Sequence, residues 1–135
     1  MNASYAVRDA LLRFYEAFSS GDPDAFAGVI ATADGVSVIG TEPGSGARDR
    51  DSWLHTYATL ISPAGVRFEA GDDPVGYAEG TVGFATDTPT AFVADGSYVP
   101  TRITAVLHQE TGQWKVVHLH VSVGVPDEDV LQPPG

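Results

Sequence analysis

The sequence predicts an α+β domain in which helices from the first half of the chain pack on one face of a curved antiparallel sheet from the second half. Residues 4–61 contain three segments whose apolar residues recur every three or four positions, as on one face of a helix. Residues 66–124 contain four β-type segments separated by turn clusters. A chain of 135 residues is long enough to bury one core. We therefore expect a single domain over residues 1–125, followed by an acidic, Pro-rich tail over 126–135.

The first two predicted helices adjoin each other. Apolar side chains at helical spacing run through residues 4–20, and Ser4 can cap the start of this helix. Gly21 can adopt the left-handed conformation that often follows a helix, and Asp22 can cap a second helix over residues 23–30. The two helices should therefore meet at a sharp turn.

A short strand and a third helix follow. Residues 36–40 are typical of a strand, and the Gly- and Pro-rich segment 41–46 of a loop, which we expect at the rim of any cavity. Asp49 or Asp51 starts the third helix. Its predicted buried stripe consists of Trp53, Leu54, Tyr57, Leu60 and Ile61.

The second half of the chain predicts a four-strand meander connected by hairpins. Pro74 and Pro89 cannot donate to a strand ladder, so we expect edges, bulges or breaks at these two positions. The predicted strands cover residues 66–77, 81–93, 98–109 and 114–124.

The last strand alternates between two kinds of side chain. Residues two apart on a strand share a face. One face carries Trp114, Val116, His118, His120 and Ser122, and the other carries Val117, Leu119, Val121 and Val123. A three-residue hairpin loop at Thr111–Gly112 would add Arg102, Thr104, Val106 and His108 to the first face.

Three segments between residues 5 and 124 resemble the cone-shaped fold of nuclear transport factor 2, which is also described as cystatin-like. Residues 14–26 are similar to the Gly-Asp helix break of that superfamily, and residues 38–44 to the loop of SnoaL-like proteins. Residues 106–122 resemble the final hairpin of the association (hub) domain of calcium/calmodulin-dependent kinase II. The chain is thus identified as a SnoaL-like member of this superfamily.

The resemblance implies a cavity between the helices and the curved sheet, and a homodimer formed through the outer face of the sheet. The aliphatic row of the last strand suits the cavity side. The predicted pocket consists of Phe14, Tyr15, Phe18, Val38, Trp53, Tyr57, Ala105, Leu107, Leu119 and Val121. The predicted interface consists of Arg102, Thr104, Trp114, His118, His120 and Ser122.

The groups used by the fold's known catalysts are missing at the matching positions. Ketosteroid isomerase uses a carboxylate base together with a Tyr and a protonated Asp. The resemblance places Phe14 at the Tyr, Val38 at the base, and Ala105 or Val106 at the second Asp. The arginines of the hub pocket correspond to Ala105 and Val121.

Composition excludes several other functions. A net charge of −11 argues against binding to nucleic acid or anionic membranes, and we expect a cytoplasmic protein without a membrane span. The chain has no Cys and no cofactor motif, so no cofactor is expected. A metal site at His118 and His120 needs a third ligand, and His108 would lie several rows away along the hairpin, so no metal is expected. Ser122 and His120 lie on one strand with no oxyanion donor, so a Ser-His nucleophile is not expected either.

The sequence therefore predicts a pocket protein that binds a hydrophobic or aromatic small molecule. Whether it also catalyses a proton transfer, such as cyclisation, isomerisation or dehydration, stays open. Candidate catalytic side chains are Tyr15, Tyr57, His118 and His120. The alternative is a non-enzymatic association module that resembles the kinase hub.

Overall fold

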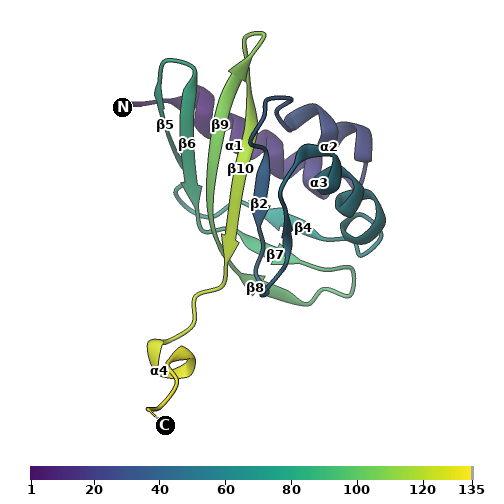
Figure 1. Ribbon diagram of the computed structural model, residues 1–135, viewed down its shortest axis with the longest axis vertical. Coiled ribbons are helices and arrows are strands. Elements are labelled where there is room, and N and C mark those ends of the chain that lie inside the picture. The colour runs from purple at the N-terminus through teal and green to yellow at the C-terminus, as the bar shows by residue number, and fades with distance from the viewer. Residues whose placement is uncertain (135) are drawn as a thin grey trace.

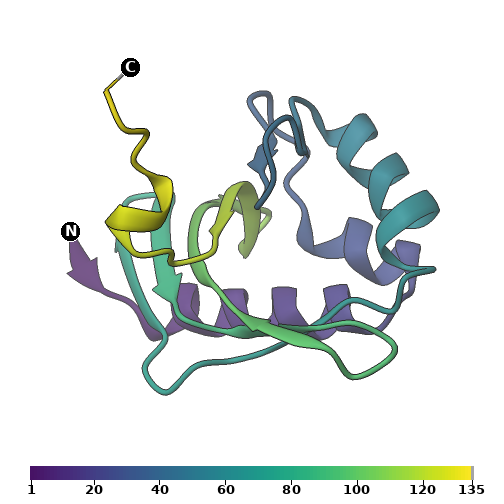
Figure 2. The same cartoon turned by 90° about the horizontal axis from the view of Figure 1, so that it is seen from below.

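The computed structural model describes residues 1–134 and has the predicted α+β architecture (Figure 1). Helices α1 to α3 lie on one side of a curved sheet (Figure 2). A one-turn helix, α4, lies in the exposed tail that leads away from the domain. The helical elements are α1 (Tyr5–Ser19), α2 (Pro23–Val29), α3 (Arg50–Thr56), the π-helical turn η1 (Tyr57–Ile61) and α4 (Asp127–Val130). No helix within residues 1–134 combines the length and apolar character needed to cross a membrane.

The predicted helix caps are confirmed. The Ser4 hydroxyl accepts a hydrogen bond from the Val7 N–H at 3.1 Å, and the Asp22 carboxylate accepts one from the Asp24 N–H at 2.9 Å. Each side chain satisfies a backbone donor that the first turn of a helix leaves free. Gly21, with φ of +71°, makes the left-handed turn between α1 and α2.

The strands form two sheets rather than one meander. The larger sheet has the order β1-β5-β6-β9-β10-β2-β3, and the smaller one has the order β4-β7-β8. All pairings are antiparallel except that of β2 with β10. The strands of the large sheet are β1 (Asn2–Ala3), β5 (Val75–Glu79), β6 (Val82–Asp87), β9 (Arg102–Glu110), β10 (Gln113–Ser122), β2 (Ser37–Ile39) and β3 (Gly46–Ala47). Those of the small sheet are β4 (Arg67–Glu69), β7 (Thr90–Phe92) and β8 (Tyr98–Pro100).

Three of the four predicted long strands are each broken in two, which corrects the simple meander. The breaks separate β4 from β5, β6 from β7, and β8 from β9. Pro74 and Pro89 lie within the first two breaks, where a missing N–H does not interrupt a ladder. At the third break, the backbone N–H and the hydroxyl of Thr101 both donate to the Pro89 carbonyl, at 2.9 and 2.8 Å.

The final hairpin has a two-residue turn and a bulge in place of the predicted three-residue loop. Thr111 and Gly112 both have positive φ, 48° and 80°, as in the tightest hairpins. The extra residue that we expected in the loop lies instead in a bulge of β10, where the pairing with β9 shifts between Val116 and His118. Because the turn has two residues, Val116 lies opposite Leu107, and it is 1% exposed.

The two-residue turn corrects the predicted outer face before the bulge, and the bulge restores the predicted face beyond it. Trp114 shares the face of Val116 and packs against the core, so it does not belong with the outer residues. Beyond the bulge, the pairing follows the predicted parity. His118 lies opposite Val106, His120 opposite Thr104, and Ser122 opposite Arg102.

Aromatic rings join the three N-terminal helices into one layer. Phe14 and Phe18 of α1 contact Phe26 of α2, with ring centroids 5.9 Å apart in both pairs. Phe26 in turn stacks on Tyr57 at 4.0 Å, and its ring meets Trp53 edge-on at 5.5 Å. Such contacts add to the free energy of burying each ring, so α3 and η1 are held against the first two helices.

A buried carboxylate connects α1 to the strand breaks. Asp87, at the end of β6, is 6% exposed. Its Oδ2 accepts hydrogen bonds from the Tyr15 hydroxyl and from the Gly71 N–H, both at 3.0 Å. A side chain at Gly71 would meet the Thr88 carbonyl at 2.6 Å, so the backbone passes Asp87 too closely for any other residue. Asp87 thus ties α1 to the segment between β4 and β5.

Replacing Tyr15→Phe should lower the free energy of unfolding by about 2 kcal/mol, because a buried charged acceptor loses one of its two donors. Chemical denaturation with urea measures this change. Tyr5→Phe is the matched control, since Tyr5 is 77% exposed and should shift the unfolding free energy by less than about 0.5 kcal/mol. Equal effects of the two substitutions would show that the Asp87 contact contributes nothing.

The free energy of unfolding should also fall as pH rises, and part of this fall should come from the Tyr15 hydroxyl. Burial, and then the neighbouring Asp87 carboxylate, raise the pKa of the Tyr15 hydroxyl above its usual value. The unfolded chain therefore releases this proton at about pH 10, while the folded chain keeps it. The contribution of the Tyr15 hydroxyl to the free energy of unfolding is complete below about pH 10 and is lost as pH rises above it. Urea titrations at a series of alkaline pH values should give a shallower decline for Tyr15→Phe than for the unmodified chain.

Candidate functional site

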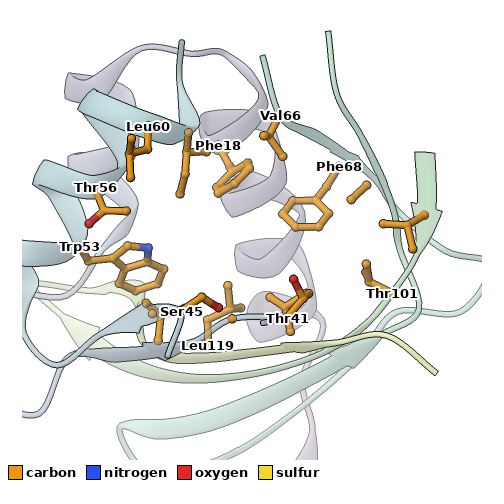
Figure 3. A pocket seen from close by; sticks show the side chains of 17 residues that line it. Phe18, Thr41, Ser45, Trp53, Thr56, Leu60, Val66, Phe68, Thr101 and Leu119 are labelled. Atoms are coloured by element: carbon orange, nitrogen blue, oxygen red, sulfur yellow. The ribbon is translucent and has the colours of Figure 1, made fainter. Parts of the chain in front are cut away.

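A cavity of about 350 Å³ lies between the helices, the concave side of β10 and β2, and the small sheet (Figure 3). Phe18 of α1, Trp53 of α3 and Phe68 of β4 turn their rings toward it. The turn η1 adds Leu60 and Ile61, and β10 adds Leu119 and Val121. The cavity therefore exists only where all these layers meet.

The lining is almost entirely apolar. Its polar side-chain groups are the hydroxyls of Thr41, Ser45, Thr56 and Thr101 and the indole N–H of Trp53. Two of these are engaged within the protein, since Ser45 donates to the Glu42 carbonyl at 2.9 Å and Thr101 donates to Pro89. None of the residues around the cavity has an ionisable side chain. A lining of this composition is typical of sites for apolar molecules, and it contains none of the side chains that usually serve as a general base.

Half of the predicted pocket residues line the cavity and half do not. Those that do are Phe18, Val38, Trp53, Leu119 and Val121. The others belong to the solid core beside it, at exposures of 4% or less: Phe14, Tyr15, Tyr57, Ala105 and Leu107. They share a face with the lining residues but lie where helices and sheet pack directly against each other.

The four candidate catalytic side chains are not brought together. The Tyr15 hydroxyl donates to Asp87, and the Tyr57 hydroxyl donates to the Phe18 carbonyl at 2.7 Å. Burial raises the pKa of Tyr57, so this hydroxyl stays protonated. His118 and His120 lie on the outer face of β10, and their neighbours Leu119 and Val121 face the cavity. None of these four side chains lines the cavity.

Sequence reasoning missed the wall of the cavity made by the small sheet. The ring centroid of Phe68 lies 4.9 Å from that of Phe18, but the sequence pattern places Phe68 in the first strand of the meander and does not show that this segment turns toward the helices. Ala91 and Val99 were missed for the same reason. Pro89 was the one signal available, because it marks the break after which β7 turns toward the cavity.

The outer face of the large sheet carries apolar and imidazole side chains. Tyr77 and Phe84 stack there at 5.4 Å, next to Val106. His118 and His120 follow on β10, and the Arg102 guanidinium donates to the Ser122 hydroxyl at 3.2 Å. The predicted interface residues therefore lie together on this face, apart from Trp114.

Solved structures share this fold. A protein of unknown function of the nuclear transport factor 2-like type from Pseudomonas putida superposes with a TM-score of 0.75, at 18% identity over 94% of each chain. A protein from Streptomyces avermitilis, provisionally named a dehydratase of the same type, matches with a TM-score of 0.74, at 23% identity over 90% of this chain and 95% of its own.

A third structure, from Thiobacillus denitrificans, is provisionally named a calcium/calmodulin-dependent protein kinase type II association domain. Its TM-score is 0.69, at 19% identity over 86% of this chain and 93% of its own. At such identities these structures establish the fold and not the activity. No curated protein matches this chain significantly.

The family is established separately, from the sequence. The model of the SnoaL-like domain matches residues 7–126, which include every element from α1 to β10 except the first two residues of α1. The match extends over the strand breaks, the small sheet and the final hairpin that together enclose the cavity. This chain belongs to the SnoaL-like domain family.

Proposed function

We propose that the protein binds a neutral, hydrophobic small molecule in the cavity and does not transform it by acid–base chemistry. The observation that carries this proposal is the lining, which combines three aromatic rings with hydroxyls and contains no ionisable side chain. Burying apolar ligand surface there supplies the binding free energy, at roughly 25 cal/mol per Å². A charged ligand would leave water for a site with no counter-ion.

The hydroxyls define where the polar end of such a ligand lies. Thr41, in the loop before β3, and Thr56, at the end of α3, make no side-chain hydrogen bond within residues 1–134. Either can donate to a carbonyl or hydroxyl of a ligand whose apolar body rests among Phe18, Trp53 and Phe68. A molecule with a single neutral polar group therefore fits better than a hydrocarbon.

Catalysis of a proton transfer would need a base within hydrogen-bond reach of the ligand. Val38 and Val121 occupy the places where the resemblance to ketosteroid isomerase and to the hub domain would put a base and an arginine, and both line the cavity. The activities suggested by the names of the dehydratase and association-domain neighbours are therefore not proposed for this chain. Binding alone is the function that the lining supports.

The dye Nile red, which is neutral and fluoresces strongly in apolar surroundings, should bind to the protein at this site. Ala91→Trp should weaken that binding about tenfold or more, because Ala91 lines the cavity and a large ring would fill it. The matched control is Ala58→Trp, since Ala58 is exposed on η1 and does not line the cavity. Fluorescence titration measures both affinities, and circular dichroism verifies that both variants are folded. Equal affinity in the two variants would place the dye elsewhere and contradict the proposal.

A second proposal concerns self-association through the outer sheet face. Tyr77 and Val82 are 37% and 49% exposed there, and Ile39 is 48% exposed on the neighbouring β2. These apolar side chains surround Val106, Phe84 and the two histidines, a mixture typical of the core of a subunit interface. The proposed assembly is a homodimer with a two-fold axis across this face.

Replacing Val106→Glu should convert the dimer to a monomer, because the carboxylates of the two subunits would be brought close together among apolar side chains near the axis, where like charges repel. Val93→Glu is the control: Val93 is 40% exposed in the turn after β7, away from this face. Sedimentation velocity at matched concentrations reports the association state. A wild-type chain that sediments as a monomer, or a Val106→Glu variant that stays dimeric, would refute this interface.

A further inference from the structure

The outer face of β10 carries two imidazoles at the spacing of a metal chelate. His118 and His120 lie two residues apart on one strand, beyond the bulge, so both project from the same face. Their Cα atoms are separated by about 6.6 to 6.8 Å along the strand. From that separation, two rings can turn their nitrogens toward one ion at bond lengths of about 2.0 to 2.1 Å.

His118 is already oriented for such a role. Its Nδ1 lies 2.8 Å from the hydroxyl oxygen of Ser37 on the adjacent strand β2. With the Nδ1–H donating to Ser37, the Nε2 carries the lone pair that a metal ion requires. A metal-binding histidine is commonly fixed in this way by a hydrogen bond from its second ring nitrogen. His120 is exposed and free to rotate toward the same point.

Two imidazoles are too few for a closed site, and one copy of the chain does not supply the rest. Within residues 1–134 there is no group of three or more His, Asp or Glu side chains that could hold a metal ion. Around a two-fold axis, however, each subunit presents the same residues to its partner. Two copies facing each other across β10 would supply four imidazoles, which is the ligand number of tetrahedral Zn²⁺.

We propose that His118 and His120 from two copies of this chain bind one Zn²⁺ or a similar divalent transition-metal ion at the subunit interface. Imidazole ligands suit zinc, copper and nickel and do not suit magnesium or calcium. The net charge of −11 favours the approach of a cation to each subunit and opposes the approach of one subunit to the other. A shared cation offsets part of that repulsion. This inference rests on the proposed outer-face interface and not on the cavity.

The test is isothermal titration of the full chain with ZnCl₂, together with sedimentation velocity in zinc and in EDTA. We expect one Zn²⁺ per two chains and tighter association in zinc than in EDTA. His118→Ala and His120→Ala should each abolish both effects. Ser37→Ala should keep the stoichiometry and weaken zinc binding about tenfold. The control is His55→Ala, an exposed histidine on α3, which should bind as the wild type does.

Other outcomes overturn the proposal. Binding of one Zn²⁺ per chain without a change in sedimentation would exclude a bridging site, and unchanged binding by His120→Ala would place the metal elsewhere. If the wild-type chain associates in EDTA, the Val106→Glu variant does not, and no zinc binds, the proposed interface is retained and the proposed metal site is rejected. Co²⁺ substitution gives an independent readout, because four imidazoles in a tetrahedron produce intense visible absorption that a two-histidine aqueous complex does not.

Discussion

The cavity depends on the breaks that divide three long strands between two sheets. Without them, β4, β7 and β8 would continue in the plane of the large sheet, and nothing would close the space between α1, α3 and β10. Proline removes ladder donors at two of the breaks, and the Pro89 carbonyl accepts both donors of Thr101. Asp87 then attaches the same region to α1 through Tyr15 and Gly71. A few polar contacts in a mostly apolar interior thus set the angle between the sheets.

The helices could be predicted closely because their signals are local. Ser4, Gly21 and Asp22 mark helix ends through contacts within a few residues, and the structure uses all three as expected. The strand breaks and the bulge depend on partners far away in the chain. The register of the last hairpin involves such a partner, because Val116 forms a bridge with Ile30 and its carbonyl accepts a hydrogen bond from the Ala31 N–H, both just after α2. This is why Trp114 was assigned to the wrong face while His118 and His120 were not.

The sequence predicts which kinds of residue surround the cavity, but not which individual residues line it. We expected the aromatic and aliphatic residues of one face to surround a pocket. However, a helix face that packs directly against the sheet has the same composition as one that borders a cavity. Phe14 and Phe18 illustrate this, since both are buried on α1 and only Phe18 reaches the cavity. The difference is set by where β4 turns inward to place Phe68 against Phe18, a tertiary contact with no local signature.

Strand β10 links the two proposed functions of the protein. Leu119 and Val121 form part of the cavity wall, while His118 and His120 alternate with them on the outer face. Because the backbone is shared, a shift of β10 that accommodates a ligand also displaces both histidines. The parallel pairing with β2 couples them further, since Val38 lines the cavity and Ser37 holds His118. The proposed ligand site and the proposed subunit interface therefore share β10, and any effect of ligand binding on association would be matched by an equal effect of association on ligand binding.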